Sequence, residues 1–220
     1  MWDIHNGIHG NYNGKHSEWE EGRHLIFFSD TQLDYLKKAK SWYVDGTFKI
    51  VKDPFTQLLT IHTTVMYNNK TTSIPIAFIL MSRRRKIDYL AVFKKIIEIV
   101  EKESNEKPRV KKIMADFEIA LWQAIRTLKS TNYLPDIIMK WCFFHFCQAT
   151  FRKVMIYNLR KDYFNEKESG TRINIKWLIS LPLLPVPQMV EAFSSLERKL
   201  KDRICTNLKH LMKYYKDNWI

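Results

Sequence analysis

The run WYVDGTFKIV, residues 42–51, places one carboxylate in a stretch that otherwise reads as a buried strand. Its β-branched and aromatic residues favour a strand, in which alternate side chains point to opposite faces. Asp45 is then expected on the face opposite Trp42 and Val44. Because an unpaired charge in a core is costly, either neighbouring groups satisfy Asp45 or a cation sits on it. The small residue Gly46 would leave room for such a ligand to approach.

Two further strand-like runs, 55–67 and 71–82, follow closely and are separated by the turn-forming segments KDPF and YNNKT. This spacing is typical of an antiparallel meander of three strands. Apolar residues then recur at helical spacing over 87–103 and 117–128, with the short strand-like segment VKKIMADF between them. The hydrophobic pattern therefore indicates consecutive strands first, and alternating helices and strands after them.

A fifth strand begins near Asp136 and runs into a helix that we expect to continue through Gln148 to about Asn165. The order of three strands, helix, strand, helix, strand, helix predicts an α/β domain with a mixed five-stranded sheet. Beyond about residue 170, the proline-broken connector LPLLPVPQ and two helical patterns predict an all-helical part. We therefore expect three segments: a flexible N-terminal lead-in at 1–23, an α/β core at 24–168 and a helical part at 169–220.

Composition restricts the class of protein and of partner. A hydrophobic content of 45% and an aromatic content of 14% indicate a folded chain. Lys and Arg number 36 against 23 Asp and Glu, a net charge of +13, which favours a polyanionic partner such as nucleic acid over a merely soluble basic surface. Three cysteines form no disulfide framework, and no stretch is long and apolar enough to span a membrane. We expect an intracellular protein that does not enter a membrane.

A second acid, Asp116 in MADFEIA, stands where a predicted strand gives way to a predicted helix. Taken alone, it is more simply the N-cap of that helix. Taken with Asp45, it suggests a pair of carboxylates from neighbouring strands that share divalent metal ions. Such ions activate a water or hydroxyl and stabilise the leaving oxygen in phosphodiester chemistry.

Other polar residues have two readings each. Cys142 and His145, in WCFFHF, form a C-x-x-H pair with Cys147 close by, and Cys205 and His210 could complete a zinc site. A buried cysteine with a hydrogen-bonded histidine is the favoured alternative, so we expect no structural zinc.

The basic run Arg83, Arg84, Arg85 and Lys86 is either a solvated segment or a set of phosphate contacts. His62 belongs either to the core, which we favour, or to a support for the metal site.

Four blocks of this sequence together resemble the catalytic domain of Mutator-like element (MULE) transposases. They are WYVDGTFKIVKDPFTQLLTIH, SIPIAFILMSRRRKIDYLAVF, IMADFEIALWQAI and WCFFHFCQATFRKV, in the family's order and at similar spacings. The resemblance covers roughly residues 24–160, and more loosely the helical part to residue 220. DFE-x-A, and C-x-x-H followed by a Gln-Ala pair, are its most specific motifs.

The resemblance implies a ribonuclease-H-like fold with an Asp, Asp, Glu site that binds two Mg²⁺ or Mn²⁺ ions and cleaves and joins DNA. On that mapping Asp45 is the first acid and Asp116 the second, and Cys142 and His145 match the family's C-x-x-H pair. The helices after about residue 170 resemble an insertion before the final catalytic helix. The resemblance also implies DNA, in particular transposon ends, as partner, possible homo-oligomers and a nuclear location.

The family's third acid is a Glu that follows a segment resembling the closing YYKDNWI. Glu118, Glu191 and Glu197 do not stand at that place. We therefore predict a MULE-type transposase domain that is inactive as this 220-residue chain. The alternative is a non-catalytic DNA-binding or regulatory protein derived from a transposase, either domesticated or degenerate.

Overall fold

A computed structural model describes residues 4–5, 22–165, 170–200 and 205–220. Most of the predicted flexible lead-in at 1–23 lies outside these residues. The chain divides into two compact units, Met1–Cys142 and Phe143–Ile220, and each is described by itself. The predicted domain limits at 24–168 and 169–220 stay a prediction, although the helix Phe143–Ile156 (α4) groups with the second unit.

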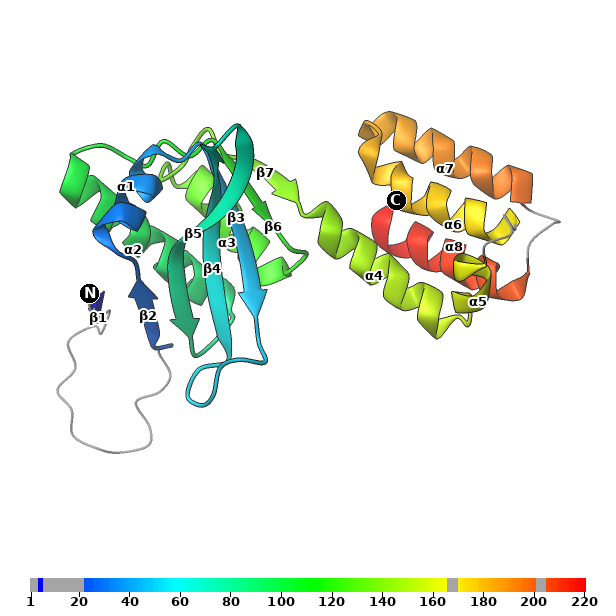
Figure 1. Cartoon of the computed structure of the whole chain (residues 1–220), viewed down its shortest axis with the longest axis horizontal. Coiled ribbons are helices and arrows are strands. Elements are labelled where there is room, and N and C mark those ends of the chain that lie inside the picture. Colours follow the sequence, from blue (N-terminus) through cyan, green and yellow to red (C-terminus); the bar gives the residue numbers. More distant parts are fainter. Residues whose placement is uncertain (1–3, 6–21, 166–169, 201–204) are drawn as a thin grey trace. The chain divides into compact units, whose positions relative to one another are not determined.

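The first unit contains a mixed sheet of seven strands in the order β1-β2-β5-β4-β3-β6-β7 (Figure 1). The strands are β1 (Ile4–His5), β2 (His24–Phe27), β3 (Ser41–Thr47), β4 (Gln57–Tyr67), β5 (Lys70–Met81), β6 (Lys112–Ala115) and β7 (Ile138–Trp141). β3, β4 and β5 form the expected antiparallel meander, and β6 and β7 continue the sheet in parallel with β3.

The α/β class with a mixed sheet is confirmed, but the predicted number of five strands is wrong. β2 pairs antiparallel with the last four residues of β5, and β1 pairs with β2. The segment that forms β2, HLIF at 24–27, is short and apolar. However, four residues carry no signal of which edge they join, so its place in the sheet could not be predicted.

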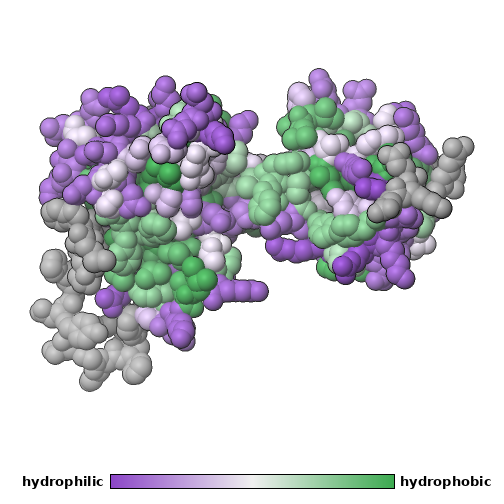
Figure 2. All heavy atoms as spheres, viewed as in Figure 1, coloured by the Kyte–Doolittle hydropathy of each residue, from purple (hydrophilic) through white to green (hydrophobic). Residues whose placement is uncertain are grey.

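Burial alternates along the strands and separates the two faces of the sheet. On β4, Leu59 and Ile61 are buried, whereas Leu58, Thr60 and His62 between and beside them are partly exposed. The buried face shares one core with α1 (Asp30–Lys38), α2 (Lys86–Ser104) and α3 (Ile119–Ser130). In Figure 1, α3 lies behind the central strands while α1 and α2 are seen towards their left, and Figure 2 shows apolar surface over the strands on the side facing the viewer.

The second unit is helical, and it includes the segment at 169–220 for which helices were predicted. It comprises α4, α5 (Arg160–Phe164), α6 (Gly170–Ser180), a 3₁₀ turn η1 (Leu181–Leu183), α7 (Val186–Leu200) and α8 (Thr206–Trp219). Phe146 of α4 packs edge-on against Tyr215 and Trp219 of α8, and Phe193 of α7 stacks on Tyr215. The helix expected to run to about Asn165 is broken near Asn158, which has a left-handed backbone (φ 56°).

A buried ion cluster ties the start of α2 to β2. The Asp88 carboxylate, 3% exposed, accepts hydrogen bonds from the backbone N–H of Arg85 (2.7 Å) and from its Nε (3.0 Å). His24 Nε2 lies 3.5 Å from Asp88 Oδ1. Burial alone would raise the pKa of Asp88, but the hydrogen bonds and charge of Arg85 outweigh it and lower that pKa. Burial lowers the pKa of His24 in spite of the attraction of Asp88.

Acidification should therefore destabilise the first unit in a way that depends on His24. Because the folded protein resists protonating His24, the unfolded chain takes up the proton first as the pH falls through about 6.5. The free energy of unfolding should fall by up to about 1.4 kcal/mol per pH unit below that point. Urea melts between pH 8 and pH 5 should show the loss in the wild type and in His62→Gln, but much less of it in His24→Gln. A wild-type stability that stays level over this range would contradict the assignment.

Candidate functional site

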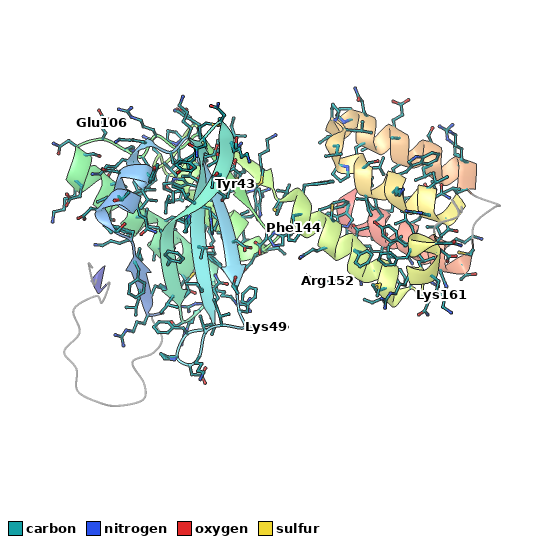
Figure 3. The ribbon with its side chains drawn as sticks, viewed as in Figure 1. Tyr43, Lys49, Glu106, Phe144, Arg152 and Lys161 are labelled. Carbon is teal, nitrogen blue, oxygen red and sulfur yellow. The ribbon has the colours of Figure 1, made fainter. Side chains whose placement is uncertain are left out.

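The parallel pairing of β3 with β6 brings the two predicted acids side by side. Val44 lies opposite Ala115 in this register, so Asp45 and Asp116 are the next residues along each chain. Adjacent strands are about 4.8 Å apart, which puts both carboxylates within reach of one small ligand. Figure 3 labels Tyr43 within β3 and Lys49 beyond its end, and Asp45 lies between them.

The charge of Asp45 is tolerated because it does not enter the core. Trp42 and Val44 are 0% and 3% exposed on the helix-covered face, whereas Asp45 is exposed. The Thr60 hydroxyl donates to the backbone carbonyl oxygen of Asp45 (3.3 Å), and His62 Nε2 lies 3.1 Å from the same hydroxyl. His62 is thus partly exposed and joined to the strand that carries the acid, rather than being a wholly buried core residue.

The space beside Gly46 is filled and does not form an approach for a ligand, contrary to the expectation from the sequence. A Cβ at this position would lie 3.3 Å from Gln57 Oε1 and 3.6 Å from Phe48 Cζ. The glycine therefore allows the buried amide of Gln57 to pack against β3. The sequence could not show this, because Gln57 lies on another strand.

Asp116 lies just beyond β6 and is not the N-cap of α3. The cap is Glu118, and α3 begins at Ile119, two residues later than expected. The Asp116 carboxylate accepts a hydrogen bond from the backbone N–H of Glu118 (3.3 Å), and the Asp116 carbonyl accepts one from Trp122 Nε1. These two hydrogen bonds fix Asp116 at the end of β6, one through its side chain and one through its backbone.

A buried polar pair, Gln57 and Tyr89, lies near Glu118. Gln57 and Tyr89 are both 0% exposed, and Gln57 Nε2 donates to the Tyr89 hydroxyl (2.8 Å). That hydroxyl donates in turn to Gln57 Oε1 (3.2 Å). Burial and the nearby charge of Asp116 raise the pKa of Glu118, against the opposing influence of Tyr89 and the attraction of Arg84. Burial and the charge of Glu118 raise the pKa of Tyr89.

The residues predicted to contact nucleic acid, which lie in different surroundings, are Arg83, Arg84, Arg85 and Lys86. Arg85 is the N-cap of α2 and bonds Asp88. The Arg84 guanidinium lies over the Phe48 ring, 4.7 Å from its centroid, and its charge acts on Glu118. Lys86 opens α2 and is exposed. Arg84 is thus exposed, packs on Phe48 and acts electrostatically on Glu118, the residue that caps α3.

An aromatic stack stands next to Asp116. The ring of Trp141, at the end of β7, stacks on Phe117 at 4.6 Å and lies 3.6 Å from the ring of Trp122, both measured between centroids. Trp141 pairs in register with Ala115, the residue before Asp116. The sequence placed Phe117 and Trp122 on a helix and Trp141 on a strand, but it gave no sign that the three rings meet.

The donors available for a metal ion are the two carboxylates. Among the described residues, no group of three or more His, Cys, Asp and Glu side chains gathers closely enough to hold a metal. Cys142 belongs to the first unit, where its backbone N–H donates to the Ala115 carbonyl (2.9 Å), and His145 belongs to α4 of the second. Two carboxylates suit a magnesium-type ion, which keeps several waters and takes phosphate oxygens as further ligands.

The match to a family model agrees with this geometry. Residues 41–149, which include β3 to β7 and both acids, match the model described as MULE transposase domain. This part of the chain is a MULE transposase domain. No curated protein matches the chain. Within the described residues, no helix combines the length and apolar character that crossing a membrane requires.

Glu118, Tyr89 and Gln57 are the residues of this MULE domain that sequence reasoning did not join to the acids. Glu118 was considered only as a possible third acid. In the sequence, Gln57 is simply a glutamine within a strand pattern, and Tyr89 is a tyrosine on the apolar side of a helix. A residue of either kind is usually an isolated polar residue at the edge of a core. Their meeting depends on how α2 packs on β4, which a pattern along the chain does not contain.

Loss of the Tyr89 hydroxyl should destabilise the MULE domain. Tyr89→Phe leaves the buried amide of Gln57 without that partner, which should cost about 1–3 kcal/mol. Tyr67, which is 68% exposed at the end of β4, provides the matched control, and Tyr67→Phe should stay within about 0.5 kcal/mol of the wild type. Urea denaturation of the three proteins measures the difference. Equal stabilities would show that the buried chain of hydrogen bonds does not form.

Proposed function

We propose that the chain carries the catalytic core of a MULE-type transposase, which cleaves DNA and joins DNA ends with a divalent metal ion. The observation that carries the proposal is the placement of Asp45 and Asp116 at neighbouring positions of two parallel strands inside a MULE domain. A ribonuclease-H-like fold is part of the proposal. The order β5-β4-β3-β6-β7, three antiparallel strands followed by two parallel ones, supports it.

Asp45 and Asp116 would hold Mg²⁺ or Mn²⁺. Such an ion, when bound, makes a water or hydroxyl nucleophilic and stabilises the leaving oxygen of a phosphodiester. The chain's own groups fix the two ligands. Thr60 holds the backbone of Asp45, and the Glu118 N–H orients the Asp116 carboxylate. The ordering of both carboxylates before the ion binds reduces the entropy that binding costs.

The partner in this proposal is DNA, approached through its phosphates. The net charge of +13 supplies attraction that does not depend on sequence. Arg84, which is exposed and lies over Phe48, is placed to contact a phosphate near the acids, and Arg83 and Lys86 are placed beside it in the chain. Arg85 has a structural role through Asp88, so we do not include it among these contacts. Action on chromosomal DNA would require a nuclear location.

The described residues present two of the three acids that the family implies. The proposed activity therefore needs a third carboxylate, and we expect the 220-residue chain alone not to cleave DNA. The non-catalytic alternative differs at this point, because a protein that only binds DNA would stay inactive with the third acid supplied.

A nicking assay tests the proposal. Supercoiled DNA is incubated with the full-length natural protein that contains this chain, in Mg²⁺, Mn²⁺ or EDTA. We expect nicking that requires the metal and falls by roughly 100-fold or more in Asp45→Asn and in Asp116→Asn, because each removes a ligand of the ion. Asp53→Asn, an exposed acid in the β3–β4 loop, is the matched control and should keep full activity.

Nicking that survives Asp45→Asn would refute the catalytic assignment. Salt-sensitive DNA binding without cleavage in either metal, by the full-length protein, would establish the non-catalytic alternative.

A further inference from the structure

Helices α4 and α8 of the second unit lie side by side (Figure 1). At one end of the pair, the rings of Phe146 and Trp219 have centroids 5.0 Å apart. Further along, the Lys153 ammonium of α4 lies 4.8 Å from the centre of the Tyr214 ring of α8. Residue numbers rise along α4 while those of the partners fall along α8. The two helices are therefore antiparallel and present a shared outer surface.

Basic and aromatic side chains gather on this surface. Tyr157 of α4 and His210 of α8 have ring centroids 5.8 Å apart. Burial raises the pKa of the Tyr214 hydroxyl and the charge of Arg152 acts against it, so Arg152 lies near the same ring. Lys213 is a neighbour of His210 on one side of α8, because three residues separate them. We call this set the α4–α8 surface, and its members are Arg152, Lys153, Tyr157, His210, Lys213 and Tyr214.

The α4–α8 surface carries positive charge that acids do not offset. The second unit, residues 143–220, has 14 Lys and Arg against 7 Asp and Glu, so it holds +7 of the net charge of +13. α4 contains no acid, and α8 contains one, Asp217. Among the described residues, no carboxylate forms a salt bridge with Arg152, Lys153 or Lys213. Arg152, which Figure 3 labels, and Lys213 are exposed, so their charges are available to a ligand.

We propose that the α4–α8 surface binds the phosphate backbone of DNA, in addition to the contacts around the carboxylates of the first unit. Lys and Arg side chains and Tyr hydroxyls are among the groups that contact DNA phosphates, and such contacts hold the duplex without reading its sequence. The choice of DNA as the polyanion rests on the proposed function. The surface itself is defined by the contacts and charges of the second unit alone.

A structural role alone accounts less well for these cations. The Lys153 ammonium covers the Tyr214 ring, so Lys153 also serves packing. Arg152 and Lys213, however, are exposed and form no salt bridge with a described acid, so they contribute little to folding. An anionic membrane is the other polyanion that such a surface could meet. The MULE transposase domain in the same chain favours DNA.

Binding of a labelled DNA duplex to the full chain tests the proposal. Fluorescence anisotropy is measured in EDTA over a range of salt concentrations, so that a metal ion at the acids plays no part. The surface variant combines Arg152→Gln, Lys153→Gln and Lys213→Gln. Each contact between a cation and a phosphate of duplex DNA adds about 0.9 to the slope of log affinity against log salt. The slope should therefore fall by roughly 2–3, and the affinity at low salt by roughly 10-fold or more.

Two matched variants separate this effect from a loss of net charge and from misfolding. The first combines Lys38→Gln, Lys70→Gln and Lys102→Gln, which removes three exposed lysines from the first unit. It has the same net charge as the surface variant, and its slope and affinity should stay close to those of the wild type. The second exchanges Lys for Arg and Arg for Lys at the three altered positions of the α4–α8 surface. It should recover most of the binding, because a phosphate accepts either cation.

The proposal is overturned if the wild type does not bind the duplex, if the surface variant keeps the wild-type slope, or if the first-unit variant loses as much. A charge-conserving variant that binds as weakly as the surface variant would attribute the loss to packing and overturn it too. Vesicles of equal parts phosphatidylserine and phosphatidylcholine are tested in parallel. If the surface variant loses vesicle binding but not DNA binding, the surface serves a membrane and the proposal is wrong.

The outcome is separable from that of the proposed function. Metal-dependent nicking by the full-length protein, together with an unchanged slope in the surface variant, refutes only the α4–α8 surface. A reduced slope in the surface variant, together with no nicking by the full-length protein, refutes only the catalytic proposal.

Discussion

The parallel pairing of β3 with β6 is the constraint on which the rest of the candidate site depends. Its register sets Val44 against Ala115, and the next residue on each strand is an acid. A shift by one residue would turn one carboxylate towards the helices, where an unpaired charge is costly. Trp42, Val44, Ile113 and Ala115 are all buried on the helix-covered face, so the hydrophobic core itself holds this register.

The candidate site combines an exposed acid with polar side chains that are buried nearby. Asp45 is exposed, whereas Glu118 is partly desolvated, and Tyr89 and the fully buried amide of Gln57 hydrogen-bond each other. Asp116 is held by the Glu118 N–H and by Trp122 Nε1. The same strand end holds the aromatic stack through Trp122. The two acids and the packed rings of Phe117, Trp122 and Trp141 are thus carried by three neighbouring strands and by the start of α3.

The sequence predicted the parts of this site that follow from patterns along the chain. Asp45 and Asp116 were found because a charge in a strand pattern and an acid at a strand-to-helix junction are local signals, and the MULE resemblance joined them. Gln57 and Trp141 were missed because their roles depend on contacts between distant elements. Gly46 was misread for the same reason, since only the structure shows what lies beside it. The number of strands was wrong because β1 and β2 join the sheet only through their pairing with each other and with β5, which no pattern along the chain contains.

The central claim is that Asp45 and Asp116 act together on one cation, and a double-mutant cycle on Mn²⁺ binding tests it most directly. The affinity of the chain for Mn²⁺ is measured by electron paramagnetic resonance for the wild type, Asp45→Asn, Asp116→Asn and the double variant. We predict that each single variant loses most of the affinity and that the double variant loses little more, because the two carboxylates share one ion. Losses that simply add, or an affinity unchanged by either substitution, would contradict the account.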